Sequence, residues 1–194
     1  MLNKLLRIGL LFAFLGLTAC VSKPTSADYE VYTLETKAKV IDKATEESYN
    51  VDLTFTVLPY KFVRLDVTAI LGYKLAELLM NTNQIQYSLR EQKVFVTGPF
   101  KSKTLRPLFK QDMNPALIWN AAHGVFVKDG MYDGQKVVTE VLSQGDQYTS
   151  RRLTIENQNF KFIWLFKSKE VSEASHDETF VLKRPENYKI ITIK

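Results

Sequence analysis

Cysteine, histidine and glycine are scarce in this chain of 194 residues, which holds one, two and eight of them. A single cysteine excludes an internal disulfide, and two histidines without a second cysteine make a poor zinc site. The few glycines form no phosphate-binding loop, and no serine lies in a Gly-x-Ser-x-Gly turn. The adjacent acids Glu46–Glu47 and Asp177–Glu178 fall in predicted turns, where solvated charge explains them. We therefore expect no catalytic residues, no metal and no cofactor, and hence no enzyme.

A large excess of one charge is also lacking. The sequence has 26 Lys and Arg against 21 Asp and Glu, a net charge of +5 at neutral pH. Along the chain the basic residues are scattered between acids. Proteins that bind nucleic acid gather their basic residues on one face or one helix, so we expect no nucleic-acid partner.

The N-terminus has the three parts of an export signal. Lys4 and Arg7 precede the apolar run Ile8–Gly16, which is too short to cross a bilayer as a stable helix. Residues 17–20, Leu-Thr-Ala-Cys, then have the pattern of a lipobox. We predict a lipoprotein signal peptide at residues 1–19, cleavage before Cys20, and covalent diacylglycerol and N-acyl groups on that cysteine. The alternative is a short membrane-anchor helix with an incidental cysteine.

The residues after Cys20 indicate where the protein is held. Each buried methylene contributes about 0.8 kcal/mol, so two or three acyl chains make an almost permanent membrane anchor. Val21 is not an aspartate, which in the sorting rule for such signals favours the outer membrane, facing the periplasm. Residues 20–27 are small and polar and contain Pro24, so we expect a lipidated tether there and a single domain at residues 28–194.

From residue 28 apolar and polar side chains alternate with a period of two, which predicts strands buried on one face. The clearest rows are Tyr32–Val40, Tyr49–Val57 and Val63–Ala69. Phe160–Phe166 is apolar on both faces except for Lys161, which predicts a central strand covered on both sides. Further strands are expected at residues 74–80, 85–89, 94–96, 136–142, 148–155, 179–182 and 188–193, which makes about ten.

Two short helices are predicted in the middle of the chain. Residues 105–109 have apolar side chains at helical spacing, and a second helix has Asn114 as its N-cap, Pro115 at its first position and Gly124 just past its end. The expected fold is mainly β: a curved antiparallel sheet, or half-closed β-barrel, lidded by two or more short helices. Such a sheet can enclose an apolar pocket, although the same side chains can also pack as an ordinary core.

Several stretches resemble the LolA/LolB-like superfamily of periplasmic lipoprotein carriers. They are residues 59–67 (PYKFVRLDV), Leu71-Gly72, residues 75–78 and the ending at residues 180–191. The predicted helices fall where that superfamily has the lid over its half-closed barrel. With the lipobox, the resemblance is nearest to the LolB branch of outer-membrane receptors. It implies that the chain receives cargo lipoproteins from a soluble LolA-like carrier, and we expect a monomer.

The resemblance also implies which residues act. Ile70, Leu71 and Tyr73 are apolar where a turn is normally polar, and Leu71 matches an exposed leucine with which the receptors are thought to enter the membrane. Ile70 is a departure, because the family often has proline there. The acyl chains of a cargo lipoprotein would lie in a cavity between sheet and lid, lined by Val51, Leu53, Phe55, Val63, Leu65, Val67, Ile85, Tyr87, Val94, Val96, Leu117, Ile118 and Trp119.

Two other functions remain open on the same fold. One is a regulatory or sensory lipoprotein, resembling the periplasmic proteins that bind anti-sigma factors, although those usually carry a second domain. The other is a structural envelope lipoprotein with a filled core and no cargo transfer. A sizeable apolar cavity under the helices would favour the receptor over the structural protein.

Overall fold

The structure is a computed structural model, and it describes residues 30–69, 71–125, 127–144, 149–171 and 179–194. The predicted signal peptide, Cys20, the tether and Ile70 lie outside the described residues. Within them, no helix is long and apolar enough to span a bilayer.

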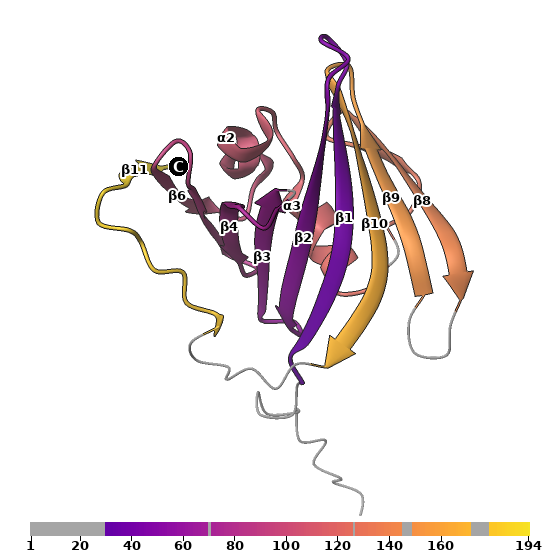
Figure 1. The fold of residues 1–194 in the computed structure, drawn as a ribbon, viewed down its shortest axis with the longest axis horizontal. Coiled ribbons are helices and arrows are strands. Elements are labelled where there is room, and N and C mark those ends of the chain that lie inside the picture. The colour runs from indigo at the N-terminus through magenta and orange to yellow at the C-terminus, as the bar shows by residue number, and fades with distance from the viewer. Residues whose placement is uncertain (1–29, 70, 126, 145–148, 172–178) are drawn as a thin grey trace, which may run out of the picture.

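One curved sheet contains all eleven strands of the described residues, in the order β11-β6-β5-β4-β3-β2-β1-β10-β9-β8-β7. The strands β11 and β7 lie at its two edges, so the sheet is not closed into a barrel (Figure 1). This confirms the predicted mainly β fold with short helices. The strands are β1 (Tyr32–Asp42), β2 (Ser48–Leu58), β3 (Phe62–Ala69), β4 (Lys74–Met80), β5 (Gln84–Leu89), β6 (Val94–Pro99), β7 (Gly130–Tyr132), β8 (Gln135–Gln144), β9 (Thr149–Glu156), β10 (Phe160–Val171) and β11 (Lys189–Thr192).

Strand pairing joins the two halves of the chain at β1, which lies between β2 and β10. All neighbouring strands run antiparallel except β11, which pairs with β6 in parallel. A long connection follows β10 and carries the chain to the far edge of the sheet before β11 begins. Such a connection permits either strand direction, whereas a short hairpin permits only the antiparallel one.

The strand expected at residues 179–182 is not formed. Phe180 and Leu182 are buried, each 8% exposed, but they pair with no strand of the described chain. The Phe180 ring instead stacks on Phe62, with centroids 5.7 Å apart, on the outer face of the sheet. The alternation of buried and exposed residues therefore comes from a segment that forms no strand and packs on the outer face of the sheet.

The prediction for Phe160–Phe166 was half right. The segment begins β10, which is central, and its inner residues Phe162, Trp164 and Phe166 are buried. On the outer face Ile163 and Leu165 are only half-buried, so the strand is not covered on both sides. Aliphatic side chains partly open to solvent are common on protein surfaces, and periodicity does not distinguish them from a second buried face.

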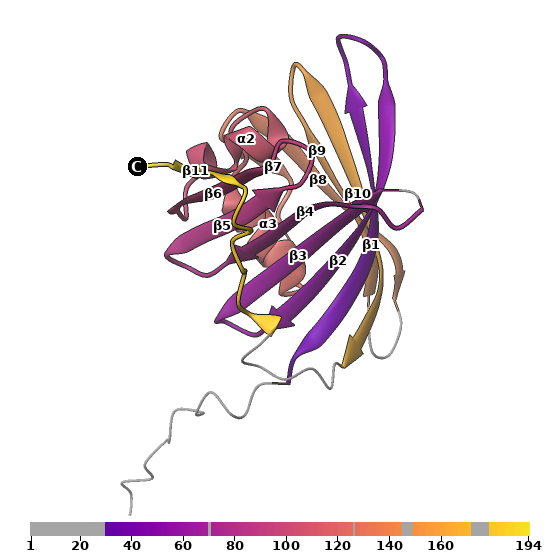
Figure 2. The same cartoon turned by 60° about the vertical axis from the view of Figure 1, so that its left-hand side comes forward.

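The helices are η2 (Ser102–Leu105), α2 (Arg106–Phe109) and α3 (Pro115–Ala122), and they lie inside the curve of the sheet (Figure 2). The Asn114 side chain accepts the backbone N–H of Ala116 at 2.9 Å, so α3 has the predicted N-cap. Gly124 follows the helix with φ of +74°, a conformation that glycine adopts without strain. The buried side chains of α3, including Leu117 and Ile118, belong to the main hydrophobic core.

The C-terminal end of α3 is held to the sheet by two strands. The Tyr32 hydroxyl of β1 donates to the carbonyl oxygen of Ala122 at 3.0 Å. The buried guanidinium of Arg151 in β9 donates to the carbonyl of Ala121 and lies 5.0 Å from the centroid of the Phe166 ring. These contacts occupy the last carbonyls of the helix, which have no partner inside it.

Candidate functional site

An apolar cavity of about 640 Å³ lies between the concave face of the sheet and α2. Its volume falls within the range of about 300–1,000 Å³ that is typical of small-molecule pockets. The lining residues come from strands β1 to β5 and β10, from α2 and from the adjoining turns: Ala38, Val40, Asp42, Ala44, Tyr49, Val51, Leu53, Leu65, Val67, Leu75, Ala76, Leu89, Glu91, Gln92, Leu108, Phe109, Lys110, Asn159, Phe160, Phe162 and Trp164.

The wall of the cavity follows from the period of the strands. Inward-facing residues of β1, β2 and β3, among them Val40, Val51 and Val67, present small aliphatic side chains to it. Strand β10 adds aromatic side chains to this wall. One of them, Phe162, contacts α2, the helix that forms the roof of the cavity. Phe109 of α2 meets the Phe162 ring edge-on, with centroids 5.5 Å apart. The charged residues of the lining are Asp42 at the end of β1, Glu91 after β5 and Lys110 after α2, so the interior between the strands favours hydrocarbon.

The mouth of the cavity is polar and lies at one end of the sheet. Its exposed residues include Tyr49 after the β1–β2 turn, Glu91 in the β5–β6 turn and Lys110 after α2. Asp42 fixes the first of these turns, because its carboxylate accepts the backbone N–H of Ala44 at 2.8 Å. A ligand with an apolar chain and a polar head therefore fits with its chain inside and its head at the mouth.

The loop between β3 and β4 lies at the same end of the sheet, because successive antiparallel hairpins alternate between the two ends. Leu71 at its tip is 99% exposed and has φ of +84°, and Tyr73 is 59% exposed. The turn is closed by backbone hydrogen bonds from Ala69 N–H to the Tyr73 carbonyl and from Gly72 N–H to the Ala69 carbonyl, at 2.8 and 3.0 Å. The loop thus holds a leucine out into solvent next to the cavity mouth.

Four of the thirteen residues proposed for the cavity line it, namely Val51, Leu53, Leu65 and Val67. The structure places the other nine outside that lining, in the packed core or against it: Phe55, Val63, Ile85, Tyr87, Val94, Val96, Leu117, Ile118 and Trp119. The physical reason is that α3 fills the space at the other end of the concave face, whereas the part beneath α2 is open.

Tyr87 illustrates how side chains pack at the end of the concave face that α3 fills, which we call the filled end. Its hydroxyl donates to the carbonyl oxygen of Thr104 at 2.9 Å, and burial raises the pKa of this side chain well above its ordinary value. The ring of Trp119 on α3 is half-buried and meets Phe100 edge-on, with centroids 6.1 Å apart. These aromatic side chains anchor the helices to each other and to the sheet.

Sequence reasoning missed the contribution of β10 and α2. Phe160, Phe162 and Trp164 line the cavity and belong to an aromatic run that the sequence shows. Leu108 and Phe109 also line it and belong to a helix that was predicted. The pairing of β1 with β10 joins residues more than a hundred positions apart, which no local pattern reveals.

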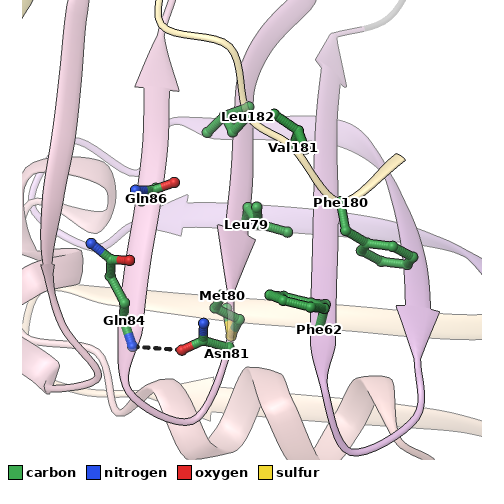
Figure 3. Close-up of a pocket in the computed structure, with 9 residues that line it drawn as sticks. All are labelled: Phe62, Leu79, Met80, Asn81, Gln84, Gln86, Phe180, Val181 and Leu182. Carbon is green, nitrogen blue, oxygen red and sulfur yellow. Dashed lines mark hydrogen bonds between the residues drawn. The ribbon is translucent and has the colours of Figure 1, made fainter. Parts of the chain in front are cut away.

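A second hollow, of about 220 Å³, lies on the outer face of the sheet (Figure 3). The segment of Phe180, Val181 and Leu182 crosses β4 there, beside the amide side chains of Gln84 and Gln86. Arg64 fastens this crossing by donating to the carbonyl of Thr179 at 2.9 Å. The hollow is smaller than typical ligand pockets, and we assign it no function.

Acidic, histidine and cysteine side chains form no cluster of three or more that would hold a metal ion within the described ranges. The same part of the chain has one buried side-chain oxygen without a hydrogen-bond partner, Oε1 of Gln135. Its amide nitrogen donates to the Asp112 carbonyl at 2.7 Å, so the side chain is anchored all the same.

Neither a protein-family model nor a curated protein matches the chain. Solved structures similar to it include a LolA superfamily protein, NE2245, from Nitrosomonas europaea, which is 5% identical with a TM-score of 0.44. That match covers 80% of this chain and 91% of the other. An uncharacterized conserved protein from Thermus thermophilus is 6% identical with a TM-score of 0.39, covering 82% and 90% of the two chains.

Proposed function

We propose that this protein is a lipid-anchored receptor of the LolB kind, which binds the acyl chains of other lipoproteins and passes them to the outer membrane. One observation carries the proposal: an apolar cavity of about 640 Å³ opens at the end of the sheet that bears the exposed Leu71. The lipobox at residues 17–20 supports the anchor on Cys20, and Val21 supports the outer membrane, facing the periplasm.

Transfer of a cargo acyl chain into and out of the cavity needs no covalent chemistry. A cargo acyl chain moves from a soluble carrier into the cavity if its affinity is higher here, and leaves for the bilayer if the bilayer binds it more tightly still. The roof helix α2 is only four residues long and has half-buried side chains at Leu108 and Phe109. It is therefore the element that moves aside for entry, while α3, with its larger buried surface and its carbonyls held, stays in place.

The direct test is titration of a chain comprising residues 21–194 with a fluorescent fatty-acyl probe. All eleven strands and both hydrophobic clusters come from residues after 30, so this chain keeps the fold. We expect saturable binding with one site. Absence of binding would instead favour the structural envelope lipoprotein with no ligand.

A matched pair of variants locates the binding site. Val51 points into the cavity and is half-buried, so Val51→Trp fills part of that space. Asn50, the preceding residue, is exposed and does not line the cavity, so Asn50→Trp adds the same ring outside it. We expect the first variant to weaken probe binding at least tenfold and the second to leave it unchanged. Equal affinities would remove the cavity from the proposal.

A further inference from the structure

The basic residues are scattered in the sequence, but the fold gathers nine of them on one side. Residues 93–110 contain five Lys and Arg and no acid, and residues 183–194 contain four with one acid, Glu186. These two stretches hold nine of the 26 basic residues and one of the 21 acidic ones. They therefore carry a charge of +8, and the remainder of the chain carries −3.

Parallel pairing of β11 with β6 brings the two stretches together. Lys189 faces Val94 across the pair, and its backbone N–H donates to the Lys93 carbonyl at 2.9 Å. Both strands and α2 lie on the same side of the molecule in the two views (Figures 1 and 2). We call the exposed surface of residues 93–110 and 183–194 the basic side. All nine of its Lys and Arg residues are exposed.

Few of these cations take part in an ion pair that the described part of the chain shows. Arg106 forms a bidentate salt bridge with Asp112, in which both N···O distances are 2.8 Å. The other eight form no ion pair within the described residues. Within the described residues Asp112 is close enough to Lys103 to interact with its charge, but most of the repulsion between the cations is not offset by an ion pair, and an anionic surface would relieve it.

The basic side is continuous with the exposed loop at Leu71. Arg90 in the β5–β6 turn donates its backbone N–H to the carbonyl of Leu75, just after the loop, at 3.0 Å. Lys93 N–H in turn donates to the Arg90 carbonyl at 3.2 Å, and β11 begins beside Lys93. The loop, this turn and the start of β11 therefore lie at one end of the sheet.

The composition of the basic side favours lipid over protein as its partner. Seven of its nine cations are lysines, and lysine is depleted in protein interfaces, which use aromatic and arginine anchors. Attraction to anionic headgroups, in contrast, accumulates from each lysine near the bilayer and needs no fixed geometry. We propose that the basic side rests on a bilayer surface rich in anionic phospholipid; this rests on the membrane contact of the proposed function, though not on the cavity.

Vesicle binding tests the inference with residues 21–194, which carry no lipid. The probes are vesicles of pure phosphatidylcholine and vesicles with about one-third phosphatidylglycerol. We expect at least tenfold tighter binding to the anionic vesicles at low salt, because several lysines act together. The preference should fall steeply at high salt, since screening shortens the reach of each charge.

Two triple variants with the same change in net charge separate the basic side from overall charge. Lys93→Glu, Lys103→Glu and Lys189→Glu lie on the basic side and do not line the cavity. The control variant carries three exposed lysines changed elsewhere in the fold: Lys39→Glu, Lys128→Glu and Lys136→Glu. We expect the first triple to abolish the anionic preference and the control to keep most of it.

Other results would overturn the inference. Equal binding to both kinds of vesicle, or equal losses in the two triples, would leave the cations as charges that keep the β11 edge from pairing with other chains. Retention on immobilised polyglutamate without any vesicle preference would point to an acidic protein instead. Fatty-acyl probe binding without vesicles, measured on the same variants, reports the cavity separately, so the failure of either proposal is recognised independently.

Discussion

Phe109 of α2 packs edge-on against Phe162 of β10, with ring centroids 5.5 Å apart and ring planes at 79°. This aromatic pair closes the cavity from above, because the two residues belong to its roof and its wall. The same pair joins α2, a helix of four residues, to the sheet. The behaviour of the roof should therefore depend on this pair.

We predict that Phe109→Ala accelerates release of a fatty-acyl probe several-fold while the fold is kept. The edge-on pair contributes about 0.5–1.5 kcal/mol beyond the area it buries, and a half-buried ring leaves a partly solvated gap when removed. Stopped-flow displacement gives the release rate, and urea unfolding gives the stability. Phe100→Ala, which removes a ring from the filled end, is the control; a similar increase in release rate there would contradict the role of α2.

The N-cap of α3 provides a test of how this helix, which we expect to stay in place while α2 moves, contributes to stability. Asn114→Ala removes the acceptor for the Ala116 N–H and should lower the free energy of unfolding by about 1 kcal/mol. Urea denaturation measures this change. Asn120→Ala, within the same helix, should change stability much less. Because the cap lies away from the cavity, probe affinity should be the same in both variants.

His123 makes the stability depend on pH in the mildly acidic range. The backbone N–H of Tyr60 donates to its Nε2 at 3.1 Å, which leaves the proton on Nδ1, 2.8 Å from the Trp119 carbonyl. Burial lowers the pKa of His123 from its ordinary 6.5, so the unfolded chain binds a proton more readily than the folded one. The stabilising effect is complete above pH 6.5 and is lost as pH falls through the lowered pKa.

The measurement is the urea midpoint at about pH 7.5 and about pH 5, on either side of the ordinary histidine pKa of 6.5. We expect a lower midpoint at the acid pH, and a smaller difference in His123→Gln, which no longer titrates. If His123→Gln and wild type lose equal stability on acidification, the titration of other groups accounts for it.

Leu71→Glu should leave binding of the acyl probe intact and slow delivery of cargo to vesicles at least tenfold. The side chain is 99% exposed, so the substitution costs the folded protein almost nothing. A carboxylate at the bilayer boundary is costly, which prevents the tip from entering. Met131→Glu, also at an exposed apolar residue, is the control. An equal loss of delivery in that variant would show that delivery does not depend on the loop.

Local patterns predicted what local physics determines. The alternation at Tyr49–Val57 and the cap at Asn114 depend on neighbours in the sequence, and both are found as expected. The cavity depends on which strand lies beside β1, and this is β10, whose residue Lys161 pairs with Ile41. It also depends on how far α3 extends along the concave face, which hydrophobic periodicity does not report. For that reason only the residues nearest α2 among those predicted line the cavity.

The described chain enters the sheet at the end opposite to the Leu71 loop. Register places Ala69, at the base of the loop, level with Val51 and hence with Ala38. From Tyr32 to Ala38 the sheet spans about 20 Å, since a strand rises about 3.3 Å per residue. The eleven residues 21–31 reach at most about 38 Å when fully extended. If Cys20 carries a lipid as proposed, that lipid and the tip of the loop can thus meet one membrane.

Shortening this reach provides a further prediction. Deleting residues 22–27 leaves five residues before Tyr32, which reach at most about 18 Å, less than the distance to the loop. We expect the lipidated deletion variant to stay membrane-bound, to bind acyl probe, and to deliver cargo as poorly as Leu71→Glu. Replacing the six residues with Gly and Ser should restore delivery, because only length matters. Failure of that replacement would show that the tether sequence itself has a role.

If Cys20 carries a lipid as proposed, a tether long enough to reach past the body would let the loop end of the domain turn toward the bilayer or away from it. The cavity mouth lies at the free end, next to Leu71. When that end swings down, the mouth meets the bilayer; when it swings up, the mouth faces the aqueous space from which a carrier arrives. In the proposed function, reorientation of the whole domain would thus present the same mouth to the carrier and to the bilayer in turn.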